Sequence, residues 1–299
     1  MDLPLTTDTT RLTPNTGNPG LEPELTDAND VETPLKTHRR FDRSARLFSE
    51  PGLHRLMSSR VLVVGVGGVG SFTAEALARS GVGHLELVDF DKVCVTNNNR
   101  QLHCMKGTVG RRKVDVMAER LRLVHPTAQI DAVPQFYNAT NSEELLGGKI
   151  DYVVDAIDNI TAKAHLLATC LKRKIPVVSS MGAAARLDPT QIRVDDLSNT
   201  IKDPFAKAVR RVLRDTYGLQ VSKGTPVGID AVFSIEEPSA PHPLAYDQAQ
   251  GFRCVCPGGK NGMHDCEQRA RIDGTASFVT GSFGLTAASV VVRRLIGEG

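Results

Sequence analysis

The segment at residues 61–71 constrains the fold more than any other part of the chain. A short apolar run at 61–64 is followed by closely spaced glycines and then by a stretch with helical character. These glycines are Gly65, Gly67, Gly68 and Gly70. Such spacing permits a tight turn, brings backbone amides close to a phosphate and lets the helix pack closely. Because the free N–H groups at a helix start favour an anion, the segment predicts a strand, a phosphate-binding loop and a helix.

A carboxylate follows at the spacing that nucleotide-binding folds use. Asp89 comes 19 residues after Gly70, at the end of the next apolar run. Its side chain can therefore accept hydrogen bonds from ribose hydroxyls. Taken alone, this fingerprint indicates only a nucleotide, and an NAD-dependent oxidoreductase is the default function. The structural alternative is a glycine turn that holds no ligand.

Strand-like and helix-like segments alternate from residue 61 onward. The apolar runs are 61–64, 85–88, 152–155 and 176–179, and the helical stretches between them are 71–80, 111–124 and 161–173. This order implies parallel strands joined by right-handed crossovers. It predicts an α/β fold with a doubly wound, Rossmann-like sheet. A C-terminal extension of strands and helices follows, with expected strands at 191–194 and 231–235 and a helix at 205–217.

The first 38 residues differ in composition from the rest. They carry seven acids against two bases, a balance of −5, and they lack any apolar period. We interpret residues 1–38 as a disordered acidic tail and residues 39–299 as folded. Since the whole chain has a net charge of +2, the folded part carries +7. That modest surplus is consistent with a polyanionic partner.

The cysteine content favours a reducing compartment. Six cysteines in 299 residues, with no signal-like start, indicate a cytoplasmic protein rather than a secreted one. The uncharged stretch 274–292 is nearly long enough to span a bilayer. However, it contains three glycines and six Ser or Thr residues. A buried core helix is therefore the favoured interpretation, and no membrane partner is expected.

Cations gather after the predicted nucleotide site. Asp91 follows Asp89 closely, Asn97 and Arg100 come next, and Lys113 lies in the basic run 111–113. A dinucleotide needs no such cluster. A triphosphate does, because its negative charges must be held while a further anion approaches the α-phosphorus. The cluster therefore favours ATP chemistry over hydride transfer.

Five motifs in order resemble the ubiquitin-activating (E1-like) adenylating enzymes. They lie at 65–70, 89–91, 97–101, 109–113 and 155–159. The resemblance covers roughly residues 40–292 and implies the binding of ATP and Mg²⁺. By that resemblance Asp89 would hold the ribose, Arg100 the outer phosphates, Lys113 the phosphate under attack and Asp158 the magnesium ion. Asp155 more simply ends its strand as a structural residue.

The same resemblance implies a homodimer. In this family an arginine near the N-terminus reaches across the dimer into the partner's ATP site, and Arg43 occupies the matching place. The alternative for Arg43 is an exposed charge on an early helix. Within one adenylating domain at 39–299, residues 39–188 would bind ATP. Residues 189–299 would bind substrate and RNA and support the dimer.

Further segments resemble one branch of the family, the tRNA threonylcarbamoyladenosine dehydratases. They lie at 40–41, 45–48, 94–97, 100–103, 188–192, 201–204 and 228–234. The resemblance implies ATP-dependent cyclisation of N6-threonylcarbamoyladenosine at tRNA position 37, through an acyl adenylate. The alternative is an adenylyltransferase that activates the C-terminus of a ubiquitin-like sulfur carrier. The sequence leaves open whether a sulfur-relay protein is also a partner.

The cysteines near the C-terminus bear on that choice. Sulfur-carrier activators usually hold a structural zinc with two Cys-x-x-Cys pairs. This chain has only Cys254, Cys256 and Cys266 there, and a tetrahedral site needs a fourth ligand such as His264. Free thiols are the favoured interpretation.

A basic stripe on the predicted helix at 205–217 suggests contact with RNA. Residues 201–214 contain five cations and one acid. Lys207, Arg210, Arg211 and Arg214 fall at helical spacings of three, four and seven. Such a stripe would bind RNA phosphates without base specificity. An ordinary solvated helix face is the alternative. Arg111 and Arg112 are expected on the surface unless tRNA reaches them.

Overall fold

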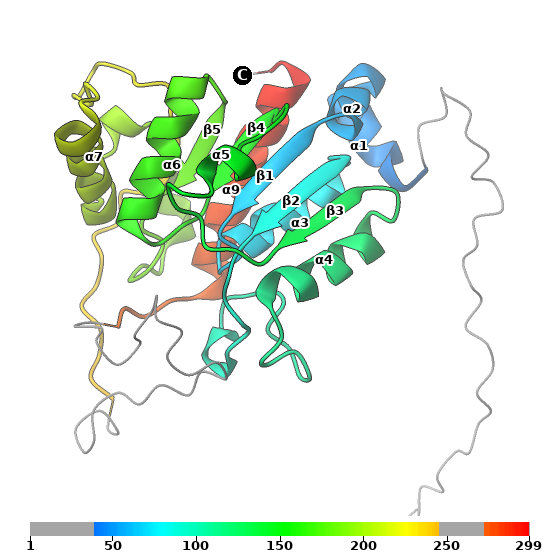
Figure 1. Ribbon diagram of the computed structural model, residues 1–299. Helices are drawn as coiled ribbons and strands as arrows, with labels where there is room; N and C mark the ends of the chain where they lie inside the picture. The colour runs from blue at the N-terminus through cyan, green and yellow to red at the C-terminus, as the bar shows by residue number, and fades with distance from the viewer. Residues whose placement is uncertain (1–38, 245–271, 299) are drawn as a thin grey trace, which may run out of the picture. The chain divides into compact units, whose positions relative to one another are not determined.

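A seven-stranded sheet forms the centre of the molecule in the computed structural model, which describes residues 39–244 and 272–298 (Figure 1). The strand order is β3-β2-β1-β4-β5-β7-β6. All neighbours are parallel except β6 and β7, which are antiparallel. The predicted doubly wound α/β fold is therefore confirmed. The strands are β1 (Arg60–Val64), β2 (His84–Val88), β3 (Gln129–Val133), β4 (Tyr152–Asp155), β5 (Val177–Ser180), β6 (Ile192–Asp196) and β7 (Asp230–Ser234).

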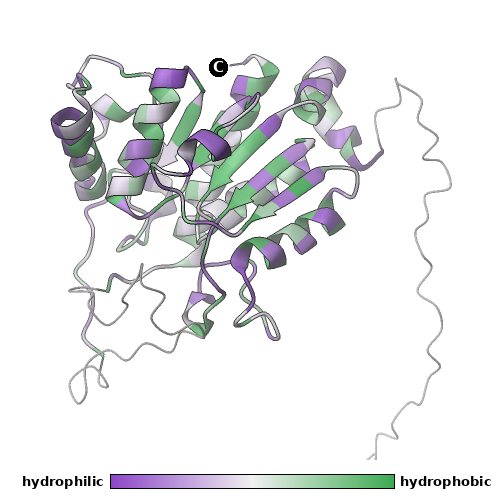
Figure 2. Cartoon of the chain, viewed as in Figure 1, coloured by the Kyte–Doolittle hydropathy of each residue, from purple (hydrophilic) through white to green (hydrophobic). Residues whose placement is uncertain are grey.

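Helices cover both faces of this sheet. The described α-helices are α1 (Asp42–Phe48), α2 (Glu50–Met57), α3 (Gly70–Ser80), α4 (Lys113–Val124), α5 (Ser142–Leu145), α6 (Ile160–Arg173), α7 (Pro204–Tyr217) and α9 (Ser277–Ile296). Short 3-10 helices lie at Arg39–Phe41, Val95–Asn97, Pro189–Gln191 and Leu197–Asn199. Side chains alternate in direction along a strand. In β1, Val61 and Val63 consequently join the core under α3 and α9, while Leu62 and Val64 join the core under α6 and α7. The apolar strands are visible in Figure 2.

Among the strands and α-helices from β1 onward, two escape the sequence prediction, β3 and α5. The segment QIDAV of β3 is an edge strand, of which only Ile130 is fully buried. Edge strands show weak hydrophobic patterning because one side faces water. The four-residue helix α5 is too short to produce a helical period.

The predicted core helix at 274–292 appears as α9. By length and composition it could cross a membrane, but 61% of its most apolar 18-residue window is buried in the fold. Its backbone packs closely on α3, since a Cβ on Gly284 would lie 2.5 Å from the carbonyl oxygen of Val69. The burial supports the interpretation of 274–292 as a core helix.

Helix α7 begins as its sequence suggests. Asp203 caps it, since its Oδ1 accepts a hydrogen bond from the backbone N–H of Ala206 at 2.9 Å, and Pro204 occupies the first helical position. The cap is buried, with Asp203 only 4% exposed. The start of α7 is thereby fixed against the body of the fold.

Candidate functional site

The strand order reverses its direction of growth between β1 and β4. From β1 the chain adds β2 and β3 on one side, and from β4 it adds β5 on the other. Loops at the carboxyl ends of such neighbouring strands diverge and leave a crevice, the usual ligand position in this fold class. The glycine loop follows β1 there, and residues 156–159 follow β4.

The glycines of this loop divide into two kinds. Gly65 has φ +93°, and a Cβ there would lie 2.6 Å from the carbonyl oxygen of Ala156; at Gly70 it would lie 1.8 Å from that of Gly65. These two positions close the turn and admit only glycine. Gly67 is open instead, since the nearest atom to an added Cβ is the side-chain nitrogen of Gln101 at 3.9 Å, whereas a Cβ on Gly68 would lie 3.2 Å from the Arg100 side chain. The loop therefore presents accessible backbone.

Asp89 is fixed beside the glycine loop. Its Oδ2 accepts a hydrogen bond from the N–H of Val66 at 2.7 Å, and its Oδ1 accepts one from the N–H of Asp91 at 2.8 Å. Burial raises the pKa of Asp89, although the Lys113 ammonium and both N–H donors oppose that shift. Each carboxylate oxygen accepts only one of these bonds and keeps capacity for a hydroxyl group.

Lys113 is a buried cation at the first position of α4. Its side chain is 7% exposed, and Nζ lies 2.7 Å from Asp91 Oδ2. Burial alone would lower the pKa of Lys113, but the carboxylates of Asp89, Asp91 and Asp158 outweigh burial and raise it. A permanent ammonium therefore lies beside the glycine loop, in surroundings that strengthen its field.

Asn97 and Arg100 lie in the loop after β2. The Asn97 side chain is buried, and its Oδ1 accepts from the backbone N–H of Cys94 at 2.9 Å, which shapes the loop. Arg100 Nη1 donates to Thr96 O at 3.1 Å and to Asn99 Oδ1 at 2.9 Å. The aliphatic part of Arg100 covers Gly68. This predicted phosphate-binding arginine is thus held at the open side of the glycine loop.

Asp158 and Arg43 lie at opposite edges of the sheet, Asp158 at the carboxyl edge and Arg43 near the amino edge. Asp158 is exposed in the loop after β4 and shifts the pKa of Lys113. Arg43 is exposed in α1, beyond Phe41, whose ring contacts His125 just after α4. The C-terminal end of α4 lies at the amino edge of the sheet, away from the crevice (Figure 1). The structure brings the other predicted ATP-site residues together, but not Arg43.

Sequence reasoning missed a second lysine–aspartate pair at the crevice. Lys163 and Asp155 are both 0% exposed, and Nζ lies 2.6 Å from Asp155 Oδ2. Nζ also lies 3.2 Å from Ser179 Oγ and 3.0 Å from the carbonyl oxygen of Ser180. Asp155 accepts from the N–H of Ile157 as well, which fixes the start of the loop that carries Asp158. One sequence signal could have indicated this pair, namely a lysine among alanines and leucines on the buried face of a helix.

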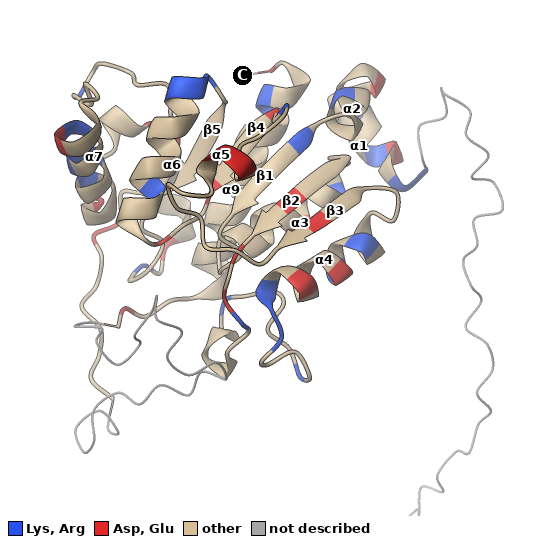
Figure 3. Ribbon diagram, in the orientation of Figure 1, with Lys and Arg blue, Asp and Glu red and all other residues tan. Residues whose placement is uncertain are grey.

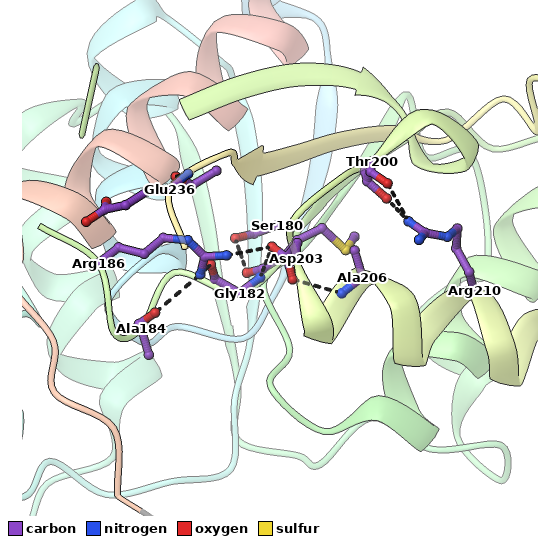
Figure 4. A network of polar contacts seen from close by, with 11 residues as sticks. Ser180, Gly182, Ala184, Arg186, Thr200, Asp203, Ala206, Arg210 and Glu236 are labelled. Atoms are coloured by element: carbon purple, nitrogen blue, oxygen red, sulfur yellow. Dashed lines mark hydrogen bonds and ion pairs between the residues drawn. The ribbon is translucent and has the colours of Figure 1, made fainter. Parts of the chain in front are cut away.

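A buried network links the loop after β5 to α7 (Figure 4). Arg186, only 4% exposed, donates through Nη1 to Gly182 O and Ala184 O, and its Nη2 lies 3.4 Å from Asp203 Oδ2. The N–H of Gly182 donates to the same Asp203 oxygen at 3.1 Å. Burial raises the pKa of Asp203, while these donors and the Arg186 charge oppose the shift. No sequence pattern foretold this network.

The expected basic stripe of α7 requires correction at Arg210. The Arg210 guanidinium is turned inward, where it donates to Thr200 O at 3.0 Å and to the Thr200 hydroxyl (Figure 4). Carbonyl groups left open at the end of a short 3-10 helix attract it. Arg211 and Arg214 both lie near Asp215, at 3.3 and 3.2 Å. Lys207 is exposed as predicted, so the stripe is only partly neutralised.

The candidate zinc ligands Cys254, Cys256, His264 and Cys266 lie outside the described residues, so the structure does not test a zinc site there. The predicted acidic tail at residues 1–38 also lies outside them. Within residues 39–244 and 272–298, three or more His, Cys, Asp and Glu side chains nowhere cluster in a way that would hold a metal ion. Cys94, Cys104 and Cys170 are buried free thiols. Burial raises the pKa of Cys170 to about 12, so this thiol stays neutral.

Comparison with known proteins supports the interpretation of the motifs. Residues 41–299 match the model of the ThiF family. The chain belongs to the ThiF family. Assignment to this family confirms the resemblance to adenylating enzymes that the ordered motifs indicated.

This ThiF-family chain is similar to several dehydratases. It is 40% identical over 262 residues to the tRNA threonylcarbamoyladenosine dehydratase of Escherichia coli strain K12, a match that covers 87% of this chain and 94% of the relative. The protein of that name from Bacillus subtilis strain 168 is 47% identical over 198 residues, which cover 66% and 75% of the two chains. The crystal structure of the E. coli dehydratase in complex with ATP gives a TM-score of 0.74 at 38% identity, covering 87% of this chain and 94% of that one.

Proposed function

We propose that the chain catalyses ATP-dependent cyclisation of N6-threonylcarbamoyladenosine at position 37 of tRNA. The observation that carries the adenylation step is the buried Lys113 ammonium, 2.7 Å from Asp91 and next to the glycine loop. The identity of the substrate is supported by the dehydratases to which the chain is similar over most of its length.

ATP is a substrate of this reaction, and the residues around the glycine loop suit it. The open backbone at Gly67 suits a chain of phosphates. In this proposal Asp89 binds the ribose hydroxyls, Arg100 the outer phosphates and Lys113 the α-phosphate. Asp158 is exposed beside Lys113 and forms no hydrogen bond or ion pair with any described residue. It suits Mg²⁺, which takes one or two carboxylates and fills its other positions with water and phosphate oxygens.

The chemistry follows from the poor reactivity of a carboxylate. The threonyl carboxylate attacks the α-phosphorus of ATP, a new P–O bond forms and pyrophosphate leaves. The ureido group of the same side chain then attacks the acyl carbon, and AMP leaves with the former carboxylate oxygen. Lys113 stabilises the negative charge that grows at the α-phosphate. Because the second step is intramolecular, proximity contributes up to about 7–11 kcal/mol. Bound magnesium would supply further charge neutralisation.

The test is a mass measurement on the nucleoside. The protein is incubated with ATP and tRNA that carries linear threonylcarbamoyladenosine, and the nucleosides are then separated. We expect the modified nucleoside to lose the mass of one water molecule, with one AMP formed per cyclisation. A protein that adenylates a sulfur carrier instead would exchange pyrophosphate into ATP without altering the nucleoside, and that result would remove the dehydratase function.

In a homodimer, Arg43 of one protomer would complete the ATP site of the other. Within one protomer Arg43 lies at the edge of the sheet opposite the crevice, so only a second copy could bring it to ATP. Mixing an Arg43→Ala chain with a Lys113→Ala chain should therefore restore activity. Each mixed dimer contains one intact site, so random exchange should return about a quarter of the wild-type rate. Activity that stays at the level of the single variants in verified mixed dimers would exclude action across the dimer.

A further inference from the structure

The chain between β2 and α4 is strongly basic. We call residues 92–112 the basic loop; it carries five cations and no acid: Lys92, Arg100, Lys106, Arg111 and Arg112. It leaves the sheet at the carboxyl end of β2 and returns at the first residue of α4, so both of its ends meet the proposed ATP site. In Figure 3, Lys and Arg positions colour parts of the ribbon of these loops blue, below α4.

The two ends of the basic loop pair with each other. The N–H of Val93 donates to Arg111 O at 2.8 Å, and the N–H of Lys113 donates to Asp91 O at 3.0 Å. Lys92 and Arg112 face each other across this short antiparallel ladder. Since side chains alternate along extended backbone, Asp91 and Lys113 point inward to form their ion pair. Lys92 and Arg112, one residue away on each strand, are exposed on the outer side.

Three cations of the basic loop are not used by the fold. The side chains of Lys92, Lys106 and Arg112 are exposed and make no hydrogen bond or ion pair with any described residue. Arg111 differs, because it pairs with Glu119. Arg100 is also engaged, since it bonds within its own loop. The unpaired charges therefore lie at the ladder and at the tip, where Lys106 is next to Gly107 in a turn with φ +86°.

We propose that the basic loop, through Lys92, Arg112 and Lys106, binds the phosphodiester backbone of the RNA that carries the substrate nucleoside. The inference rests on the proposed function and names the surface that function uses. A nucleoside whose carboxylate reacts beside Lys113 brings its own flanking phosphates to the rim of the crevice. Lys92 and Arg112 form that rim on the outer side of the Asp91–Lys113 pair. Exposed cations without acids are the side chains that contact nucleic-acid phosphates.

Helix α7 is the weaker RNA surface. Its Arg210 is directed inward and Asp215 neutralises part of the charge of Arg211 and Arg214. It follows β6, which is separated from β2 by β1, β4, β5 and β7, a distance of about 24 Å across the sheet. The basic loop, in contrast, begins one residue after Asp91.

The test compares two matched pairs of substitutions. One chain carries Lys92→Ala and Arg112→Ala, and the other carries Arg211→Ala and Arg214→Ala on α7. Binding of fluorescent anticodon stem-loop RNA is measured by anisotropy at several salt concentrations. For the first chain we expect affinity to fall about tenfold and the salt slope to fall by about 1.4, which corresponds to two lost phosphate contacts on single-stranded RNA. The α7 chain should stay within about twofold of wild type.

ATP binding, measured by calorimetry, monitors the pocket in every variant and should not change. If Lys92→Ala and Arg112→Ala reduce ATP binding, the test uses Lys106→Glu at the tip of the basic loop instead. This variant should also weaken RNA binding. The proposal is overturned if RNA affinity is unchanged in the basic-loop variants, whether or not the α7 variant loses it. A wild-type chain that binds no tRNA would instead refute the proposed function itself.

Discussion

Replacing Lys113 with alanine should slow tRNA cyclisation by about 10²-fold or more while the chain stays folded. The Lys113 ammonium is buried, so its field at a neighbouring phosphate is weakly screened. Asp91 and Asp89 hold it in place and keep it protonated. Charge grows on the α-phosphate only as the carboxylate attacks, so the loss should fall on the rate of the chemical step. Single-turnover cyclisation with saturating ATP measures that rate directly.

The control for Lys113→Ala must account for the aspartates it leaves behind. Removing the cation leaves Asp91 without its partner, which could itself disturb ATP binding. The double variant Lys113→Ala, Asp91→Asn removes that repulsion. Turnover that returns to near wild type in the double variant, or that never falls in the single one, would contradict the role of Lys113. Lys149→Ala, whose side chain is 86% exposed, controls for the loss of a surface lysine.

Replacing Lys163 with methionine should lower the free energy of unfolding by about 3–5 kcal/mol. Methionine keeps the length of the side chain but leaves the Asp155 carboxylate as an unpaired charge with no exposure to water. Ser179 and the N–H of Ile157 remain as its donors and cannot neutralise it. Urea unfolding followed by circular dichroism measures the loss.

Two matched variants separate charge from packing in this pair. Lys172→Met removes an exposed lysine from the same helix and should change stability by less than about 0.5 kcal/mol. The double variant Lys163→Met, Asp155→Asn removes both charges and should recover part of the loss, because no ion stays buried without a partner. A Lys163→Met chain as stable as Lys172→Met would show that the buried pair contributes nothing.

The parts of the site that the sequence predicted are those encoded locally. Gly65 is required by its own φ of +93°, Gly70 by its approach to the carbonyl oxygen of Gly65, and Asp89 follows at the end of the next strand. Short-range patterns of this kind can be recognised without knowledge of the tertiary fold. Most strands and helices were located for the same reason, since their apolar periods are strong.

The parts that could not be predicted depend on contacts between distant segments. Lys163 meets Ser179 only because β4 and β5 are neighbours, and Arg186 meets Asp203 only once the loop after β5 packs on α7. Arg210 followed a helical spacing that suggested an outward stripe, yet open carbonyl groups near Thr200 turned it inward. Spacing alone does not reveal which donors and acceptors the fold leaves unsatisfied.

The two outer strands of the sheet bear on how copies of the chain can associate. At one border β3 has Asp131, which bonds His84 at 2.7 Å, and at the other β6 exposes Arg193 and Asp195. Charged side chains along a border discourage a further strand from adding to it. We therefore expect any symmetric assembly to be built through helices and loops, and not by merging two sheets into one continuous sheet. The strands that border the nucleotide site would then all belong to one subunit, even where a neighbouring subunit adds a side chain to that site.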